Sequence, residues 1–146
     1  MDRTLVVGFD GSEEACKALD YAAAAVNGGK LFVVTAVVPP PEWAGTPRWQ
    51  QTIDEEHARG AALLDQAIER LPDGVGYSTE LLEGPAADAI AGVADARQAD
   101  AIVVGSRGLG RVRAVLGSVS HDLLHVSDVP VVVIPRRALE TEEEES

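Results

Sequence analysis

The sequence is poor in cysteine and in aromatic residues, and each shortage limits what the protein can be. Cys16 is the one cysteine among 146 residues, so no intrachain disulfide can form and a reducing compartment is permitted. Aromatic residues make up only 4% of the chain although 46% of it is hydrophobic, so we expect a core of valine, leucine, isoleucine and alanine. At this length, that composition suits one domain of helices packed on a sheet.

Long apolar runs are also missing. No stretch approaches the roughly 20 apolar residues that a membrane-spanning helix needs. The first residues, MDRTLVVGFD, lack the basic and then apolar layout of a secretory signal. We therefore expect a cytoplasmic protein that does not enter membranes.

Positive charge is scarce, since 12 lysines and arginines face 24 acids. Five of the acids lie in the final ETEEEES, and we expect residues 139–146 to be a disordered, solubilising tail. The acidic surface argues against nucleic acid as a partner unless a local basic patch exists. Residues 101–121 are such a patch, because they contain no acid and hold Arg107, Arg111 and Arg113.

Short apolar runs alternate with longer amphipathic ones. The alternation predicts a single doubly wound α/β domain, with a mostly parallel five-stranded sheet and helices on both faces. Residues 42–51, which hold both tryptophans, are interpreted as a loop. The third and fifth strands are expected at the sheet edges, the last because Pro130 and Pro135 flank it. Strands are predicted at 5–9, 31–38, 76–83, 101–105 and 130–135, and helices at about 13–26, 52–71, 86–98 and 118–126.

The glycine-rich stretch GSRGLGRVRAVLGSVS, residues 105–120, follows the fourth predicted strand. Ligands of open α/β sheets bind beyond the carboxyl ends of the strands, and glycines there let backbone amides approach an anion closely. Gly117 and Ser118 begin the next predicted helix, where unpaired amides and a hydroxyl suit phosphate. A polyphosphate site is therefore predicted. The spacing fits neither a Walker A loop nor a Rossmann fingerprint.

Asp10 ends the first predicted strand, in FDGS. Its carboxylate could accept a hydrogen bond from a ribose hydroxyl or an adenine amine. It could equally face solvent and cap the next helix, and the sequence leaves both alternatives open.

Four segments within residues 3–136 together resemble the universal stress protein family: VVGFDGSEEACKAL, IVVGSRGLG, GSVSHDLL and PVVVIP. The resemblance implies strand order 3-2-1-4-5, which brings Asp10 and Gly105 together. ATP-binding members resemble G-x2-G-x9-G-[ST] after the fourth strand. This chain has Gly105, Gly108 and Gly117 followed by Ser118, with eight residues in the longer spacer.

The resemblance implies a nucleotide-binding domain over residues 1–138, with ATP as ligand and Mg²⁺ or Mn²⁺ carried on its phosphates. Asp10 would contact the nucleoside, a backbone group near Ala36 the adenine, and Gly105 the ribose. The phosphates would meet Gly108, Gly117 and Ser118, with Val119 and Ser120 as helpers and Arg107 raising the local potential. The family also implies a homodimer through the apolar edge strand that holds Val131, Val132 and Val133.

The leading prediction is an ATP-binding stress-response protein whose nucleotide occupancy regulates conformation, dimerisation or partner binding. No nucleophile or catalytic base stands beside the phosphate loop, so any ATP hydrolysis is expected to be slow. The short spacer favours one alternative, a nucleotide-free dimeric scaffold. A nucleotidyl transferase would need a second substrate site, and a phosphoacceptor receiver domain would need acids and a lysine where Asp10, Glu83 and Pro135 stand.

Other chemically capable residues are interpreted as structural. His121 and His125 lie four residues apart on the last predicted helix but lack a third metal ligand nearby. Cys16 has Lys17 as its one basic neighbour and is expected to be inert. His57 is expected to be solvated, and Trp43 and Trp49 to cover hydrophobic surface rather than to stack on a base.

Overall fold

The structure is a computed structural model that describes residues 2–37, 47–106 and 118–135. The predicted acidic tail and the predicted site residues Arg107, Gly108 and Gly117 lie outside these ranges. Strands and helices alternate as the sequence predicts. The elements are β1 (Thr4–Gly8), α1 (Glu13–Ala25), β2 (Lys30–Val37), α2 (Pro47–Arg70), β3 (Gly76–Glu83), α3 (Ala86–Ala96), β4 (Ala101–Gly105), α4 (Ser118–Val126) and β5 (Val131–Ile134).

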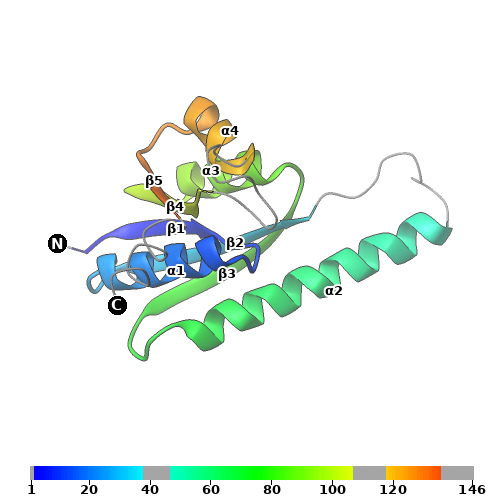
Figure 1. The fold of residues 1–146 in the computed structure, drawn as a ribbon, viewed down its shortest axis with the longest axis horizontal. Helices are drawn as coiled ribbons and strands as arrows, with labels where there is room; N and C mark the ends of the chain where they lie inside the picture. The colour runs from blue at the N-terminus through cyan, green and yellow to red at the C-terminus, as the bar shows by residue number, and fades with distance from the viewer. Residues whose placement is uncertain (1, 38–46, 107–117, 136–146) are drawn as a thin grey trace, which may run out of the picture.

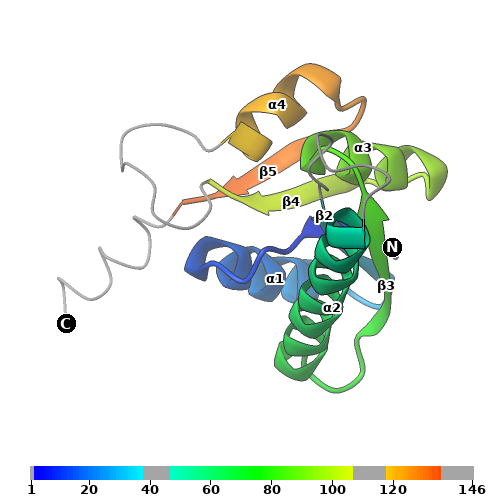
Figure 2. The same ribbon diagram turned by 90° about the vertical axis from the view of Figure 1, so that its right-hand side faces the viewer.

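The strands form one parallel sheet in the order β3-β2-β1-β4-β5, which confirms the predicted fold class. Helices α1 and α2 cover one face of the sheet, and α3 and α4 cover the other (Figures 1 and 2). The strand order reverses at β1. The chain adds β2 and β3 on one side of β1, and then adds β4 and β5 on the other side. Val7 of β1 pairs with Val103 of β4, so the carboxyl ends of these two strands share one edge of the sheet.

The core is built in two layers, one on each face of the sheet. Val7 and Leu19 belong to the layer under α1 and α2, and Val6, Ile90 and Ile102 to the layer under α3 and α4. Each is at most 3% exposed, so each contributes about 1.5–3 kcal/mol from burial of its side chain. As the composition predicts, valine, leucine, isoleucine and alanine supply most of both layers.

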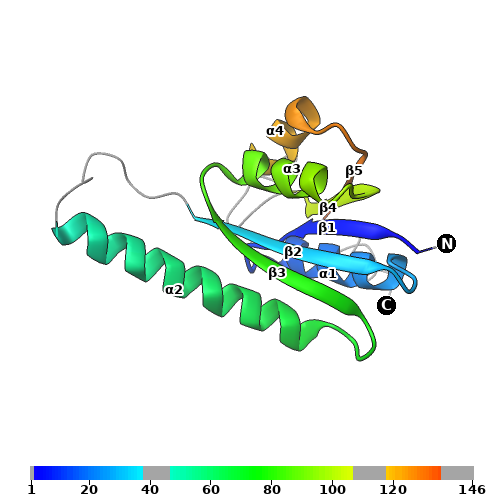
Figure 3. The same cartoon turned by 180° about the vertical axis from the view of Figure 1, so that it is seen from behind.

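Helix α2 begins at Pro47, so the prediction of a loop up to residue 51 is wrong from that proline onward. Proline suits the first turn of a helix because its missing N–H is not needed there. Side-chain hydrogen bonds from Gln50 to Asp54 and from Gln51 to Glu55 then support the helix at i, i+4 spacing. The amino-terminal half of α2 extends past the carboxyl ends of the strands (Figures 1 and 3).

The edge strands are the less buried ones, as predicted. Every residue of β5 is half-buried, and β3 has exposed residues at both ends. None of the helices in the described part of the chain has the length and hydropathy of a membrane-spanning segment.

Candidate functional site

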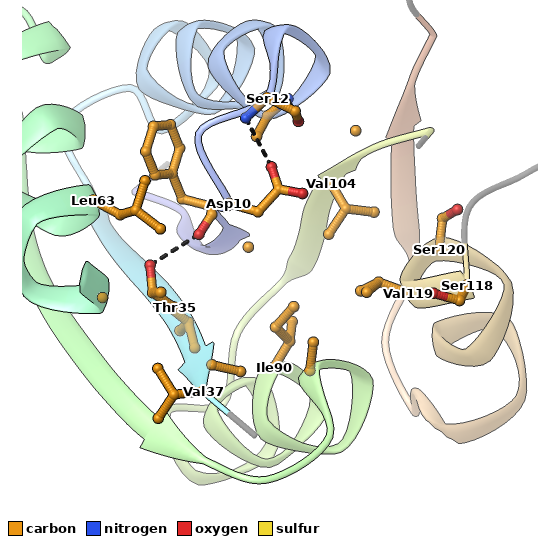
Figure 4. Close-up of a pocket in the computed structure, with 18 of the residues that line it drawn as sticks. Asp10, Ser12, Thr35, Val37, Leu63, Ile90, Val104, Ser118, Val119 and Ser120 are labelled. Atoms are coloured by element: carbon orange, nitrogen blue, oxygen red, sulfur yellow. Dashed lines mark hydrogen bonds between the residues drawn. The ribbon is translucent and has the colours of Figure 1, made fainter. Parts of the chain in front are cut away.

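A cavity of about 230 Å³ lies at the carboxyl edge of the sheet (Figure 4). The ends of β1, β2 and β4 form its floor, and residues of all four helices form its walls. The cavity therefore occupies the switch point of the sheet, where doubly wound folds bind ligands.

Six of the predicted site residues line this cavity. They come from the ends of three strands and from the first turn of α4, although they are spread over most of the sequence. The six are Asp10, Ala36, Gly105, Ser118, Val119 and Ser120.

The turn between β1 and α1 holds Asp10 at the cavity. The backbone N–H of Ser12 donates to Oδ1 of Asp10 at 2.9 Å, and Gly11 between them has a φ of +83°. Ser12 is the N-cap of α1, and its Oγ accepts the N–H of Ala15 at 3.1 Å. Asp10 thus closes the turn while Ser12 caps the helix, and the Asp10 side chain stays exposed on the cavity.

The end of β1 is fixed to β2 by two hydrogen bonds. The N–H of Phe9 donates to the carbonyl of Val34 at 2.9 Å, and Oγ1 of buried Thr35 donates to the carbonyl of Phe9, also at 2.9 Å. Backbone groups of alternate residues point to the same side of a strand. Because the carbonyl of Val34 points toward β1, the N–H and C=O of Ala36 point the same way, past the end of β1 and toward the cavity.

The first turn of α4 forms the opposite wall. Oγ of Ser120 donates to the carbonyl of Ser106 at 2.9 Å, while the N–H of Ser106 donates to the carbonyl of Ile134 at 2.8 Å. The hydroxyl proton of Ser120 is thus engaged by a backbone carbonyl of the protein. Ser118 is exposed at the helix start, where backbone amides without helical partners favour an anion.

Helix α2 supplies a wall that the sequence analysis did not include. Arg59, Gly60 and Leu63 line the cavity from this side, and Ile90 of α3 lines it from another side (Figure 4 labels Leu63 and Ile90). A Cβ at Gly60 would lie 2.5 Å from Cδ1 of Leu81, so glycine lets α2 approach the sheet. The signal was an isolated glycine within a helical pattern, which often marks close packing.

The described cavity lining holds two charged side chains, Asp10 and Arg59. Nη2 of Arg59 lies 2.6 Å from Oε2 of Glu56, and this carboxylate raises the pKa of Arg59. The side chain of His57, in the same turn of α2, is 43% exposed, and its Nε2 lies 2.8 Å from Oε1 of Glu83. Both basic side chains on this part of α2 are therefore paired with carboxylates.

The remaining candidates lie apart from the cavity lining. The rings of His121 and His125 meet edge to face with centroids 5.0 Å apart, and no group of three metal-ligating side chains occurs within the described residues. Cys16 is half-buried, and burial raises the pKa of its thiol despite the opposing charge of Arg70. Trp49 sits in the first turns of α2, and Trp43 lies outside the described residues.

Comparisons with known proteins identify the family of this chain. A family model described as the universal stress protein family matches residues 1–135. A universal stress protein of Thermus aquaticus, named for its place in the QAH/OAS sulfhydrylase 3' region, is 32% identical over 137 residues, which covers 92% of this chain and 99% of the relative.

Solved structures show the same fold. The structure of hypothetical protein MJ0577, solved to assign its biochemical function, matches with a TM-score of 0.82 at 21% identity, over 93% of this chain and 97% of the other. A universal stress protein in complex with cAMP matches with a TM-score of 0.66 at 29% identity, over 90% and 96%. The chain belongs to the universal stress protein family.

Proposed function

We propose that this protein binds ATP in the cavity at the switch point and that nucleotide occupancy regulates its conformation, dimerisation or partner binding in a cytoplasmic stress response. One observation carries the proposal. A single cavity joins the backbone N–H and C=O of Ala36, the exposed carboxylate of Asp10 and the amino terminus of α4 at Ser118. These three groups suit a base edge, a ribose hydroxyl and a phosphate, in that order.

The two ends of the cavity differ in character, as the two ends of a nucleotide do. Val37, Leu63 and Ile90 give one end an apolar lining, while Ser118 begins α4 at the other end (Figure 4). An apolar slot with a backbone donor and acceptor suits a purine. A helix amino terminus suits phosphate.

The solved complex of a 29% identical universal stress protein with cAMP supports an adenine nucleotide as the ligand class. Cyclic AMP carries one phosphate, whereas the sequence between Gly105 and Gly117 contains further glycines and three arginines, residue types that suit a longer phosphate chain. We therefore favour ATP over AMP or cAMP.

A divalent ion, Mg²⁺ or Mn²⁺, fits this site as a group carried on the phosphates. Asp10 is the one carboxylate on the described lining, and its Oδ1 already accepts the N–H of Ser12. The bound ion would supply neutralisation of phosphate charge. With no histidine, cysteine or lysine on the described lining, we expect any hydrolysis to be slow.

A homodimer through β5 is part of the same proposal. This strand is at the sheet edge, and its apolar residues are all half-buried. Because the carbonyls of Pro130 and Ile134 bond toward β4, the backbone groups of Val131 and Val133 point outward from the sheet. An apolar edge strand that pairs with no further strand in the described part of the chain is a template for pairing with a second copy, with Val132 between the two paired positions.

The test starts from freshly purified protein, which is denatured so that any released nucleotide can be identified by mass. ATP, AMP and cAMP are then titrated into the stripped protein and into Ser118→Glu. A carboxylate at Ser118 should weaken ATP binding at least tenfold, because it would repel phosphate. His121→Glu adds the same charge to an exposed position of α4 outside the cavity lining and should change affinity less than about twofold.

Each result has a clear meaning. ATP recovered from the wild type and lost in Ser118→Glu would support the proposal. If the wild type carries no nucleotide and does not respond to millimolar ATP, the nucleotide-free scaffold replaces it. Tighter binding of AMP or cAMP than of ATP would change the ligand but keep the site.

A further inference from the structure

We propose that Arg59 of α2 contacts the purine base of the bound nucleotide and is a determinant of base affinity. The inference rests on the proposed function, because it takes the cavity to be a nucleotide site. It adds a residue from an element outside the strand ends and outside the glycine-rich motif.

Arg59 lies at the end of the cavity that is away from α4. Arg59 lines the cavity beside Gly60, and a Cβ at Gly60 would lie 3.3 Å from Cγ1 of Val37. Arg59 is therefore next to the end of β2, where Ala36 presents its backbone N–H and C=O. Figure 4 shows Leu63 and Val37 on one side of the cavity and Ser118 on the opposite side, so Arg59 is at the end away from α4.

The charge around Arg59 favours contact with a neutral base over contact with a phosphate. Oε2 of Glu56 lies 2.6 Å from Nη2 of Arg59, one turn back along α2. This carboxylate offsets the positive charge and would repel a phosphate brought to the same guanidinium. A neutral base meets no such repulsion.

The shape of the Arg59 guanidinium also suits contact with a base. It is planar and weakly hydrated, and it stacks readily on aromatic faces. Glu56 engages one terminal nitrogen and so orients the plane, while the Arg59 side chain remains 62% exposed. Leu63, one turn further along α2, and Ile90 of α3 supply apolar surface on the same cavity, so a base at this end would contact apolar side chains as well as the guanidinium.

The experiment compares a ligand that has a base with one that has none. A fluorescent ATP analogue is displaced by ATP or by inorganic tripolyphosphate from the wild type, Arg59→Gln, Arg59→Lys and Arg70→Gln. Arg59→Gln should weaken ATP by about three- to tenfold and leave tripolyphosphate within twofold, as expected for loss of a cation–π contact. Arg59→Lys should also weaken ATP, because an ammonium has no planar face.

Arg70→Gln is the matched control, because Arg70 lies on the same helix but binds Asp20 at 2.7 Å and does not line the cavity. Its ATP affinity should match the wild type. The inference is overturned if Arg59→Gln binds ATP as the wild type does, or if ATP and tripolyphosphate weaken by the same factor. A wild type that binds no ATP would instead refute the proposed function itself, so the two failures are distinguishable.

Discussion

The hydroxyl of Ser120 donates a 2.9 Å hydrogen bond to the backbone carbonyl of Ser106 and so joins the first turn of α4 to the end of β4. Both residues are buried. Since the N–H of Ser106 also donates to Ile134, one short segment fixes β4, α4 and β5 relative to one another. The amino terminus of α4 is therefore held at the cavity by a side chain that the sequence analysis assigned to the phosphates.

Ser120→Ala should destabilise the protein, because it leaves the buried carbonyl of Ser106 without its donor. We expect the free energy of unfolding to fall by about 1–3 kcal/mol in urea titrations. Ser118→Ala, at the exposed neighbouring serine, should change stability by less than about 0.5 kcal/mol and weaken ATP binding instead. Equal stability losses in the two variants would contradict this division between positioning and binding.

Gly105→Ala should be costly, because the added Cβ would lie 2.5 Å from Cβ of Glu14 and 2.8 Å from its carbonyl carbon. Glu14 is buried at the start of α1, so neither residue can shift easily. We expect a loss of about 1–3 kcal/mol in unfolding free energy. Gly92→Ala is the control within α3, where no atom lies within 4 Å of the new Cβ.

The control variant should be stabilised by about 0.5–1 kcal/mol, since alanine is the better residue in a helix interior. A gain in Gly105→Ala, or an equal change in both variants, would show that the approach of β4 to α1 is looser than the structure indicates. Thermal and urea unfolding of the two variants side by side measure the difference.

The residues at strand ends could be predicted from the sequence because one topological rule brings them together. Asp10, Ala36 and Gly105 each lie at or within two residues of the carboxyl end of a parallel strand, and such ends share an edge of the sheet whatever the intervening helices do. Ser118 follows from the same rule, since α4 must begin near the end of β4. Chain order and strand periodicity indicated these loops, and the family resemblance supplied the strand order and the choice of Ala36.

The wall from α2 could not be predicted in the same way. Which face of a helix meets a cavity depends on the angle and depth at which the helix packs on the sheet. The apolar periodicity of the sequence gives neither the angle nor the depth. Gly60 sets that depth here, through its close approach to Leu81, and thereby places Arg59 on the cavity. The early start of α2 at Pro47 was missed because residues 47–51 are largely polar and lack an apolar period.

Val133→Pro should convert the proposed dimer into monomers. The N–H of Val133 points outward from the sheet edge, so proline removes a donor to a second copy without removing a bond to β4. We expect sedimentation velocity to show dimers for the wild type and monomers for the variant, with matching circular dichroism. A variant that is folded and still dimeric would exclude pairing through β5, and a monomeric wild type would exclude the dimer.

Cys16 should react slowly with alkylating reagents in the folded protein. Burial is the main cause that raises the pKa of its thiol, and the nearby acids Asp20, Asp10 and Glu13 act in the same direction, whereas Arg70 lowers it. At pH 8, iodoacetamide should therefore modify the native protein more slowly than the urea-unfolded chain. Arg70→Gln should slow the native reaction further.

The raised pKa of the Cys16 thiol also makes the stability of the protein depend on pH. A thiol whose pKa is raised by folding keeps its proton longer in the native state, so its contribution is fully present below the unfolded pKa of about 8.5 and is lost as the pH rises through the folded value. The free energy of unfolding should thus fall more steeply above about pH 8.5 in the wild type than in Cys16→Ala. A native thiol that reacts faster than the unfolded one at pH 8 would reverse the sign of the shift and make Cys16 a candidate reactive thiol after all.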